Sequence, residues 1–257
     1  MALATSQLVS AVNENFVASY RKLAHHAPRG ETQETGGAFA FVTGLPLALF
    51  NGCVVVGPSS PSALDEALSW VAGHRVPHRV WIEEAIARQL DEVPPAHGLV
   101  REDDLYPGMA LHPIPEPPAL PEDVTVEEVP ADDPTSLHAL ASEFGATPEL
   151  ARRLYPPAFI ADSDVRAFIG RLAGRPVASS LVIRSPSTSG VYGVGTLPDA
   201  RRKGVGAAVS WAAVGAGRAW NGGSIVLQSS PMGLPIYQRI GFRTVVRYVT
   251  YGRPQPG

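Results

Sequence analysis

Three consecutive cations followed by two glycines mark the stretch of sequence best suited to chemistry. The segment RRKGVG, residues 201–206, precedes an alanine-rich stretch that is typical of a helix. Glycines let backbone N–H groups converge without a Cβ in the way, and a helix N-terminus binds anions. Cations at that end oppose the helix macrodipole by about 0.3–1 kcal/mol, which a bound phosphate or diphosphate would offset. The alternative is a solvated basic turn that leads into a surface helix.

Other phosphate-binding and catalytic patterns are missing from the sequence. No Gly-x4-Gly-Lys-Ser/Thr run is present, and Pro198 stands where a dinucleotide fingerprint beginning at Gly193 and Gly195 needs its third glycine. There is no HExxH or cysteine–histidine pattern, so we expect no metal. The Gly-x-Ser-x-Gly elbow of serine hydrolases is also lacking.

Composition indicates a globular protein of one large domain or two ordinary ones. The 257 residues are 45% hydrophobic and 18% charged. The sequence has no secretory signal pattern and no apolar run of membrane-spanning length, so we expect no membrane partner. Its single cysteine, Cys53, fits a reducing cytoplasm and lies in an apolar strand pattern, where a small core residue is expected.

Charge is distributed unevenly along the chain. Residues 1–120 carry 7 basic and 13 acidic side chains, whereas residues 121–257 carry 14 and 11. From Val165 onward there are 12 cations and one acid, Asp199. This asymmetry favours an anionic partner for the second half. We expect a phosphorylated small molecule rather than nucleic acid, because the cations form one short turn and not an extended face with interleaved aromatics.

The clearest predicted boundary is the segment HPIPEPPALPED, residues 112–123, with five prolines in twelve residues. Proline cannot donate ladder hydrogen bonds and favours a stiff, extended linker. We therefore predict one domain over residues 1–117 and a second over residues 118–257.

The second half alternates strands and helices in a regular order. Apolar alternation, N-cap residues followed by proline and glycine turns predict strand, two helices, β-hairpin, strand, helix, strand, helix and a final strand. The elements are, in order, VTVEEV, DPTSLHALASEFG, TPELARRLYPPAF, VRAFIGRL with PVASSLVIRS, SGVYGVGTL, the helix from RRKGVG to about Trp220, SIVLQSS, GLPIYQRIG and FRTVVRYVTY.

The first half repeats part of that order. GCVVVG predicts a strand, SPSALDEALSWVAGH a helix, HRVWIEE a strand, AIARQLDEVPPAHG a helix and GLVREDDLYPGMAL further strand structure. A shift of 143 residues aligns His97-Gly98-Leu99 with Ile240-Gly241-Phe242. This is a weak repeat, and in the first copy GPSSPSA stands where the basic glycine turn would be.

Two motifs together resemble a known family. The segment VGVGTLPDARRKGVGAAV resembles the coenzyme A loop of the GNAT acetyltransferase superfamily, Arg/Gln-x-x-Gly-x-Gly/Ala, with Arg201, Gly204 and Gly206 at the pattern positions. LPIYQRIGF, residues 234–242, resembles its second hallmark, aliphatic-Tyr-x-x-aliphatic-Gly-Phe. The resemblance covers about residues 124–251. It implies an α/β fold with a mixed, mostly antiparallel GNAT sheet flanked by helices, and a second, degenerate GNAT-like domain at the N-terminus.

The resemblance also implies an activity and a set of site residues. The activity is transfer of an acetyl group from acetyl-CoA, as co-substrate, to an amine by direct attack. A gap between the strand before the loop and the next strand would admit the thioester, and Tyr237 would donate a proton to the departing thiolate. A phenol with a pKa near 10 is a donor at neutral pH. Residues implied to bind the cofactor are Val194, Gly195 and Thr196 for the pantetheine arm, and Arg201, Arg202, Lys203, Gly204, Val205 and Gly206 for the diphosphate.

Some features stay open at this stage. Many relatives have asparagine where this chain has Ser230, and Arg-Arg-Lys-Gly replaces the usual Arg-Gly-x-Gly. The general base is unassigned: Glu143, Glu149 and a water chain held by Ser229 or Ser230 are the candidates. Tyr237 could instead be a packing residue.

The acceptor, a small-molecule or peptide amine, is not identified by the sequence, and a homodimer is left open. The alternative function is a non-catalytic regulatory module that binds coenzyme A or another metabolite. A third hypothesis, in which the basic half binds nucleic acid, predicts that the affinity for nucleic acid falls steeply with salt concentration.

Overall fold

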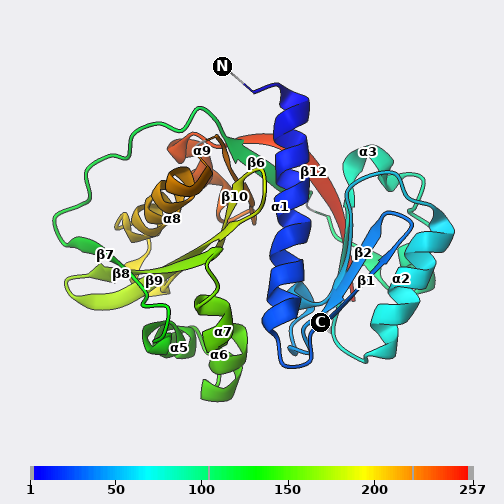
Figure 1. The fold of residues 1–257 in the computed structure, drawn as a ribbon, viewed down its shortest axis with the longest axis horizontal. Helices are drawn as coiled ribbons and strands as arrows, with labels where there is room; N and C mark the ends of the chain where they lie inside the picture. The colour runs from blue at the N-terminus through cyan, green and yellow to red at the C-terminus, as the bar shows by residue number, and fades with distance from the viewer. Residues whose placement is uncertain (1–2, 104, 222, 254–257) are drawn as a thin grey trace. The chain divides into compact units, whose positions relative to one another are not determined.

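The computed structural model describes residues 3–103, 105–221 and 223–253 (Figure 1). The chain forms two compact units: residues 1–19 with 109–243, and residues 20–108 with 244–257. The predicted division at residues 117 and 118 differs from these units. Single elements carry the chain from one unit to the other, namely α1 (Thr5–His26), β6 (Tyr106–Leu111) and β12 (Arg243–Gly252). The proline-rich segment therefore lies inside the first unit, between β6 and β7 (Val124–Glu128).

The first unit contains a mixed, mostly antiparallel sheet. Its strands lie in the order β6-β11-β10-β9-β8-β7, with β10 and β11 parallel and the pairs β7–β8, β8–β9 and β9–β10 antiparallel. Figure 1 shows α8 lying across one face of this sheet. The bounds are β7 Val124–Glu128, β8 Val165–Leu172, β9 Arg175–Arg184, β10 Ser189–Thr196, β11 Ile225–Gln228, α8 Val205–Asn221 and α9 Leu234–Ile240.

Local chemistry explains these elements. The β8–β9 hairpin turns at Ala173 (φ 48°) and Gly174 (φ 80°), the pair of positive φ angles that matches the twist of the two strands. Helix α8 is anchored where the Ser180 hydroxyl donates to the Val209 carbonyl at 2.7 Å. The core under α8 joins β8, β9, β10 and β11 to α8 and α9 through Phe168, Val182, Val191, Ala213, Val214, Ile225, Leu227, Tyr237 and Ile240.

Two of the predicted helices are shorter than expected, one of them because of proline. Helix α5 (Thr135–Glu143) forms as expected, but the single helix predicted over residues 147–159 is wrong. It is split into α6 (Pro148–Leu154) and α7 (Pro157–Ile160), because a residue that precedes proline is disfavoured in the α conformation. The helix predicted over residues 85–98 is likewise reduced, to α3 (Glu84–Ala87) and α4 (Val93–Ala96).

The strands of the second unit lie in the order β1-β2-β3-β4-β12, with β5 also paired to β12. Strands β3 and β4 are parallel, and the remaining described pairs are antiparallel. The sequence predicts no element before residue 52, whereas the structure places α1, β1 and β2 there. The bounds are β1 Glu31–Thr35, β2 Ala38–Val42, β3 Gly52–Val55, α2 Pro61–Gly73, β4 Arg79–Glu83 and β5 Val100–Arg101; the short 3-10 turns are η1 Ala48–Phe50 here and η2 Pro198–Ala200 in the first unit.

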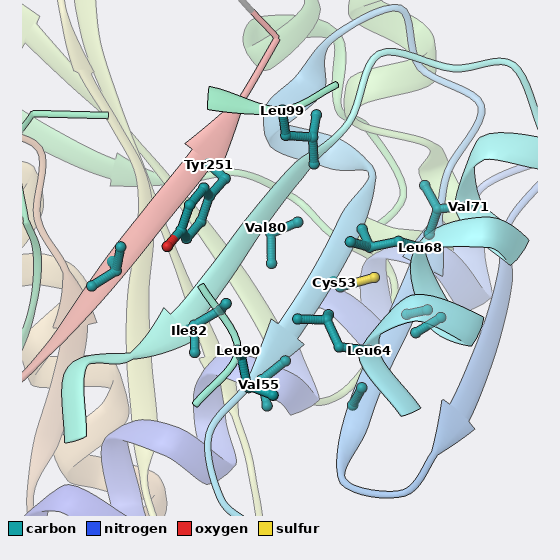
Figure 2. Close-up of a cluster of buried hydrophobic side chains, with 14 of the residues drawn as sticks. Cys53, Val55, Leu64, Leu68, Val71, Val80, Ile82, Leu90, Leu99 and Tyr251 are labelled. Carbon is teal, nitrogen blue, oxygen red and sulfur yellow. The ribbon is translucent and has the colours of Figure 1, made fainter. Parts of the chain in front are cut away.

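The core of the second unit is built between α2 and its sheet. Figure 2 shows the apolar side chains of α2 directed at β3 and β4, with Tyr251 of β12 completing the cluster. Cys53 is fully buried in this cluster, and burial raises the pKa of its thiol. The cysteine is therefore a small core residue, as its apolar sequence context predicts. The labelled members are Cys53, Val55, Leu64, Leu68, Val71, Val80, Ile82, Leu90, Leu99 and Tyr251.

The two units share a local pattern that the weak sequence repeat indicates. Each contains a strand, a helix and a second strand parallel to the first (β3–α2–β4 and β10–α8–β11), and a short helix follows, namely α9 directly after β11 and α4 after β4 and α3. A left-handed glycine follows each short helix: Gly98 (φ 72°) comes after His97, the C-cap of α4, and Gly241 (φ 111°) is the C-cap of α9. In both, the next residue, Leu99 or Phe242, donates its N–H to the carbonyl five residues back, at 3.1 and 2.9 Å. None of the described helices is long and apolar enough to cross a membrane.

Candidate functional site

The basic glycine turn joins β10 to α8. Arg201 has extended backbone angles, Arg202 has φ 63° and Gly204 has φ 83°. A positive φ at a non-glycine residue is strained by about 1–2 kcal/mol, and such strain is often retained at functional sites. The first backbone bond that enters α8 is donated by Ala208 to the Gly204 carbonyl at 3.0 Å. The N–H groups just before it have no helical acceptor and are available to an anion.

The two pattern glycines lie where the backbone passes close to other atoms. A Cβ built on Gly204 would be 2.8 Å from Cγ of Pro121. One built on Gly206 would be 2.8 Å from Oγ1 of Thr196, at the end of β10. Both distances are shorter than real Cβ contacts, so any side chain at these positions requires a neighbour to shift. Glycine therefore keeps the amide-lined surface of the turn close to the strand.

The positive charge of the turn is not neutralised by neighbouring acids. Arg201, Arg202 and Lys203 are exposed, and within the described residues none of them forms an ion pair with a carboxylate. The nearby acids Asp199 and Glu143 both pair with Arg175, the latter at 3.6 Å. The hydrogen bond from the Arg175 guanidinium lowers the pKa of Asp199 below its ordinary value. The turn therefore presents unpaired cations beside free amide groups.

Strand β10 stops pairing with β11 after Gly190, within the first half of the strand. The two strands pair in parallel at Ser189–Ile225 and Gly190–Val226, and their register continues no further within the described strands. On the other edge, β10 pairs with β9 through a bulge between Tyr192 and Gly195, with Gly193 at φ 57°. The edge of β10 beyond Gly190 thus has backbone groups without a strand partner, which an extended ligand arm can use.

A groove of about 650 Å³ lies along these elements. Eight of the ten predicted site residues line it, namely Val194, Gly195, Thr196, Arg201, Arg202, Gly204, Gly206 and Tyr237. Lys203 and Val205 do not line it. The side chain of Lys203 is exposed. Val205 is buried, and its Cγ1 would lie 2.7 Å from a Cβ built on Gly170 of β8. Val205 can therefore offer the groove only its backbone amide.

Tyr237 is held against the groove by its own motif. The residue is buried, and its ring makes an edge contact with Phe242 at a centroid distance of 5.8 Å. A Cβ built on Gly233 would be 2.9 Å from Cε2 of the Tyr237 ring. The left-handed Gly241 ends the helix, and the N–H of Phe242 then donates to the Tyr237 carbonyl at 2.9 Å. The tyrosine and the glycine–phenylalanine pair of the motif thus form one packing unit.

Sequence reasoning missed several groove residues. Phe144, at the end of α5, lies over β10, where its Cζ is 2.9 Å from a Cβ built on Gly195. Nothing in the sequence links this residue to a strand fifty positions later. Arg239 could have been found, because it shares a helix face with Pro235 and Ile236, four and three residues earlier. The other missed lining residues are Ala207, Met232, Gly233, Pro235 and Ile236; Ser230 also lines the groove.

No carboxylate or imidazole belongs to the described lining of the groove. Glu143 and Glu149 are exposed and lie outside it. Ser230 lines the groove and caps the following turn, since its Oγ accepts from the Gly233 N–H at 3.2 Å. The hydroxyl of buried Ser229 donates to the Ser230 carbonyl at 2.8 Å. The general base therefore stays unassigned.

No protein-family model and no curated protein matches the sequence, whereas solved structures match most of the chain. A GCN5-related N-acetyltransferase from Kribbella flavida is 22% identical, with a TM-score of 0.64, and the match covers 93% of this chain and 96% of that one. The chain has the GNAT N-acetyltransferase fold. A GCN5-related N-acetyltransferase from Sphaerobacter thermophilus is 18% identical, with a TM-score of 0.59, over 86% of this chain and 78% of that one.

The GNAT likeness extends over the whole chain. A tandem GNAT protein from the clavulanic acid biosynthesis pathway is 12% identical, with a TM-score of 0.61, and the match covers 100% of this chain and 99% of that one. The predicted α/β fold, with its mixed, mostly antiparallel GNAT sheet, is confirmed. At these identities the likeness establishes the fold, and the activity has to be argued from the groove.

Proposed function

We propose that the protein is an acetyl-CoA-dependent N-acetyltransferase that moves an acetyl group to an amine of a small molecule or peptide. The observation that carries the proposal is the groove itself. It joins the basic glycine turn, the unpaired edge of β10 and Tyr237 in one continuous lining. These are a diphosphate site, a site for an extended arm and a proton donor, in the order in which coenzyme A would need them.

The chain's own residues fit such a co-substrate. Amide groups of residues 202–206, with the Arg202 guanidinium, would hold the diphosphate at the start of α8. Because a Cβ at Gly204 or Gly206 would clash with Pro121 or Thr196, the two glycines let the turn lie close to these neighbours. Backbone groups of Val194–Thr196 would bind the pantetheine arm as a strand partner.

The reaction requires one bond to form and one to break. Acetyl-CoA supplies a thioester carbonyl; the amine nitrogen attacks its carbon, the C–N bond forms and the C–S bond breaks. The Tyr237 hydroxyl would give its proton to the departing thiolate, and a positioned donor of this kind is typically worth about 10²- to 10⁴-fold in rate. The proton lost by the amine goes to a base that the described lining of the groove does not identify.

The corresponding turn in the second unit is chemically different. Between β3 and α2 the chain reads GPSSP and carries no cation. The Ser60 hydroxyl accepts from the Ala63 N–H at 3.2 Å, and Pro61 contributes no N–H at the start of the helix. The chain thus caps this helix itself. We infer that this unit is the degenerate GNAT-like copy and that co-substrate binding belongs to the first unit.

One observation favours a second candidate function. The described groove lining contains no carboxylate and no histidine that could deprotonate an amine. A non-catalytic module that binds coenzyme A and regulates a partner would need no such group. Thiol release separates the two, because only the transferase frees coenzyme A from its thioester in an amine-dependent manner.

Two measurements test the proposal. Thermal shift with acetyl-CoA, coenzyme A and ATP should show selective stabilisation by the first two, following RT ln(1 + [L]/Kd). Thiol release should then be followed over a panel of amines for the wild type, Tyr237→Phe and Tyr106→Phe, the last a tyrosine outside the groove. We expect loss of rate in Tyr237→Phe alone. No stabilisation at millimolar coenzyme A would remove the function, and equal rates in all three proteins would remove the acid role of Tyr237.

A further inference from the structure

Three guanidinium groups line the groove without a compensating acid. Arg201 and Arg202 belong to the turn, and Arg239 lies on α9. The lining that the structure describes contains no aspartate or glutamate. The side chain of Arg201 is already engaged, because its Nε donates to the Thr196 carbonyl at 3.2 Å. Like charges around one groove repel one another unless an anion lies among them.

Arg239 is separate from the turn and turned toward the groove. It lies in the last turn of α9, on the same helix face as Pro235 and Ile236, which also line the groove. Its side chain is exposed and has no ion pair or hydrogen bond with another described residue. The helix macrodipole favours a cation at the C-terminus of α9. This effect does not explain why the Arg239 side chain lines a groove that holds two other guanidinium groups. A second anion beside α9 accounts for its placement.

The proposed co-substrate has two anionic groups at different places. Its diphosphate links the pantetheine arm to the nucleoside, and a separate 3′-phosphate is attached to the ribose. We propose that Arg239 binds this ribose 3′-phosphate, whereas the amides of the turn and Arg202 bind the diphosphate. The inference rests on the proposed function. Arg239 is then a specificity-determining residue that lets the groove distinguish coenzyme A from 3′-dephospho-coenzyme A.

The predicted effect is a difference between two ligands. A charge-assisted hydrogen bond to phosphate at an exposed site is worth about a five- to tenfold change in affinity. The wild type should therefore bind coenzyme A about five- to tenfold more tightly than 3′-dephospho-coenzyme A. Arg239→Gln should lose that preference by weakening coenzyme A alone. Arg239→Lys keeps the charge and should keep part of the preference.

Isothermal titration of both nucleotides into the full chain tests this directly. The proteins are the wild type, Arg239→Gln, Arg239→Lys and Arg152→Gln, the last a matched control because Arg152 is an exposed arginine in the last turn of α6 and lies outside the groove. Thermal melts of the same samples check that each variant is folded. The expected result is a preference for coenzyme A in the wild type and Arg152→Gln that Arg239→Gln lacks.

The outcomes separate this inference from the function on which it rests. If the wild type binds both nucleotides with equal affinity, the 3′-phosphate site is overturned and the proposed function stands. The same conclusion follows if Arg239→Gln weakens both nucleotides by one common factor. If the wild type binds neither nucleotide, the proposed function fails and this inference fails with it.

Discussion

Replacing Gly204 by alanine tests the shape of the turn more sharply than removing one of its charges. Gly204 has φ 83°, and an added Cβ would lie 2.8 Å from Cγ of Pro121. The left-handed conformation costs an alanine about 1–2 kcal/mol, and the contact with the proline ring adds to this. The turn can relieve both by rotating its amides away from the groove. Affinity for coenzyme A should then fall by up to about 5- to 30-fold, since 1.4 kcal/mol corresponds to a factor of ten.

Gly174→Ala is the matched control for this substitution. Gly174 has φ 80° in the β8–β9 turn, and a Cβ built on it meets no atom within 4 Å. Both substitutions therefore carry the same backbone strain, but only one lies at the groove. Calorimetric titration of coenzyme A and a thermal melt should be measured for the wild type and both variants. We expect both variants to melt earlier and only Gly204→Ala to lose affinity.

A wild-type affinity in Gly204→Ala, together with the expected loss of stability, would refute the reasoning. The strain would then be carried in the free and bound protein alike, and the shape of the turn would not matter for the ligand. Equal loss of affinity in Gly174→Ala would also refute it, because a hairpin turn outside the groove should not influence binding.

Three further substitutions test separate steps. Arg202→Gly relieves a positive φ of 63°, so we expect the unfolding free energy to stay level or rise by about 1 kcal/mol while coenzyme A affinity falls; a loss of both would contradict the strain reading. Tyr237→Phe should lower kcat by about 10²- to 10⁴-fold with little change in the KM for acetyl-CoA, and a change confined to KM would point to a binding role. Burial raises the pKa of Tyr155 above 10.0 in the folded protein, so its contribution is complete below about pH 10 and is lost as pH rises through the folded pKa. Urea unfolding of Tyr155→Phe should therefore show a shallower loss of stability above pH 10 than the wild type, and parallel curves would rule this out.

The sequence predicts the elements whose signals are local. The basic glycine turn, the β8–β9 hairpin and the glycine-capped helix α9 follow from residues within a few positions of one another. The turn residues at 173 and 174 need positive φ, and Gly241 supplies a left-handed cap. Such features depend on backbone sterics more than on tertiary packing, so single-sequence reasoning can find them.

What the sequence could not predict depends on distant packing. The chain passes from one compact unit to the other within α1, β6 and β12, and no linker-like composition marks these positions. Phe144 reaches Gly195 only because the end of α5 lies over β10. Strand β1 was missed because it is mostly polar and exposed, which hides the period of a half-buried strand. Strand β2, whose sequence AFAFV is apolar and fully buried, could have been predicted from its composition.

In the candidate site too, residues with local sequence signals were predicted and residues that depend on distant packing were not. The strand end and turn were predicted because Arg201, Gly204 and Gly206 stand at fixed spacing in one segment. The exposure of the Lys203 side chain and the burial of the Val205 side chain were not predicted. In an irregular turn, residue spacing does not show which side chains face solvent and which face the core. Predicting Arg239 as a groove residue would have required identifying which face of α9 lines the groove.

A crystal structure of the full chain with coenzyme A tests the central claim most directly. The account predicts diphosphate oxygens within about 2.7–3.2 Å of the backbone N–H groups of residues 202–206. It also predicts the pantetheine arm along β10 from Val194 to Thr196. A nucleotide bound elsewhere on the protein, or a turn whose amides are filled by the protein's own side chains at millimolar ligand, would contradict the account.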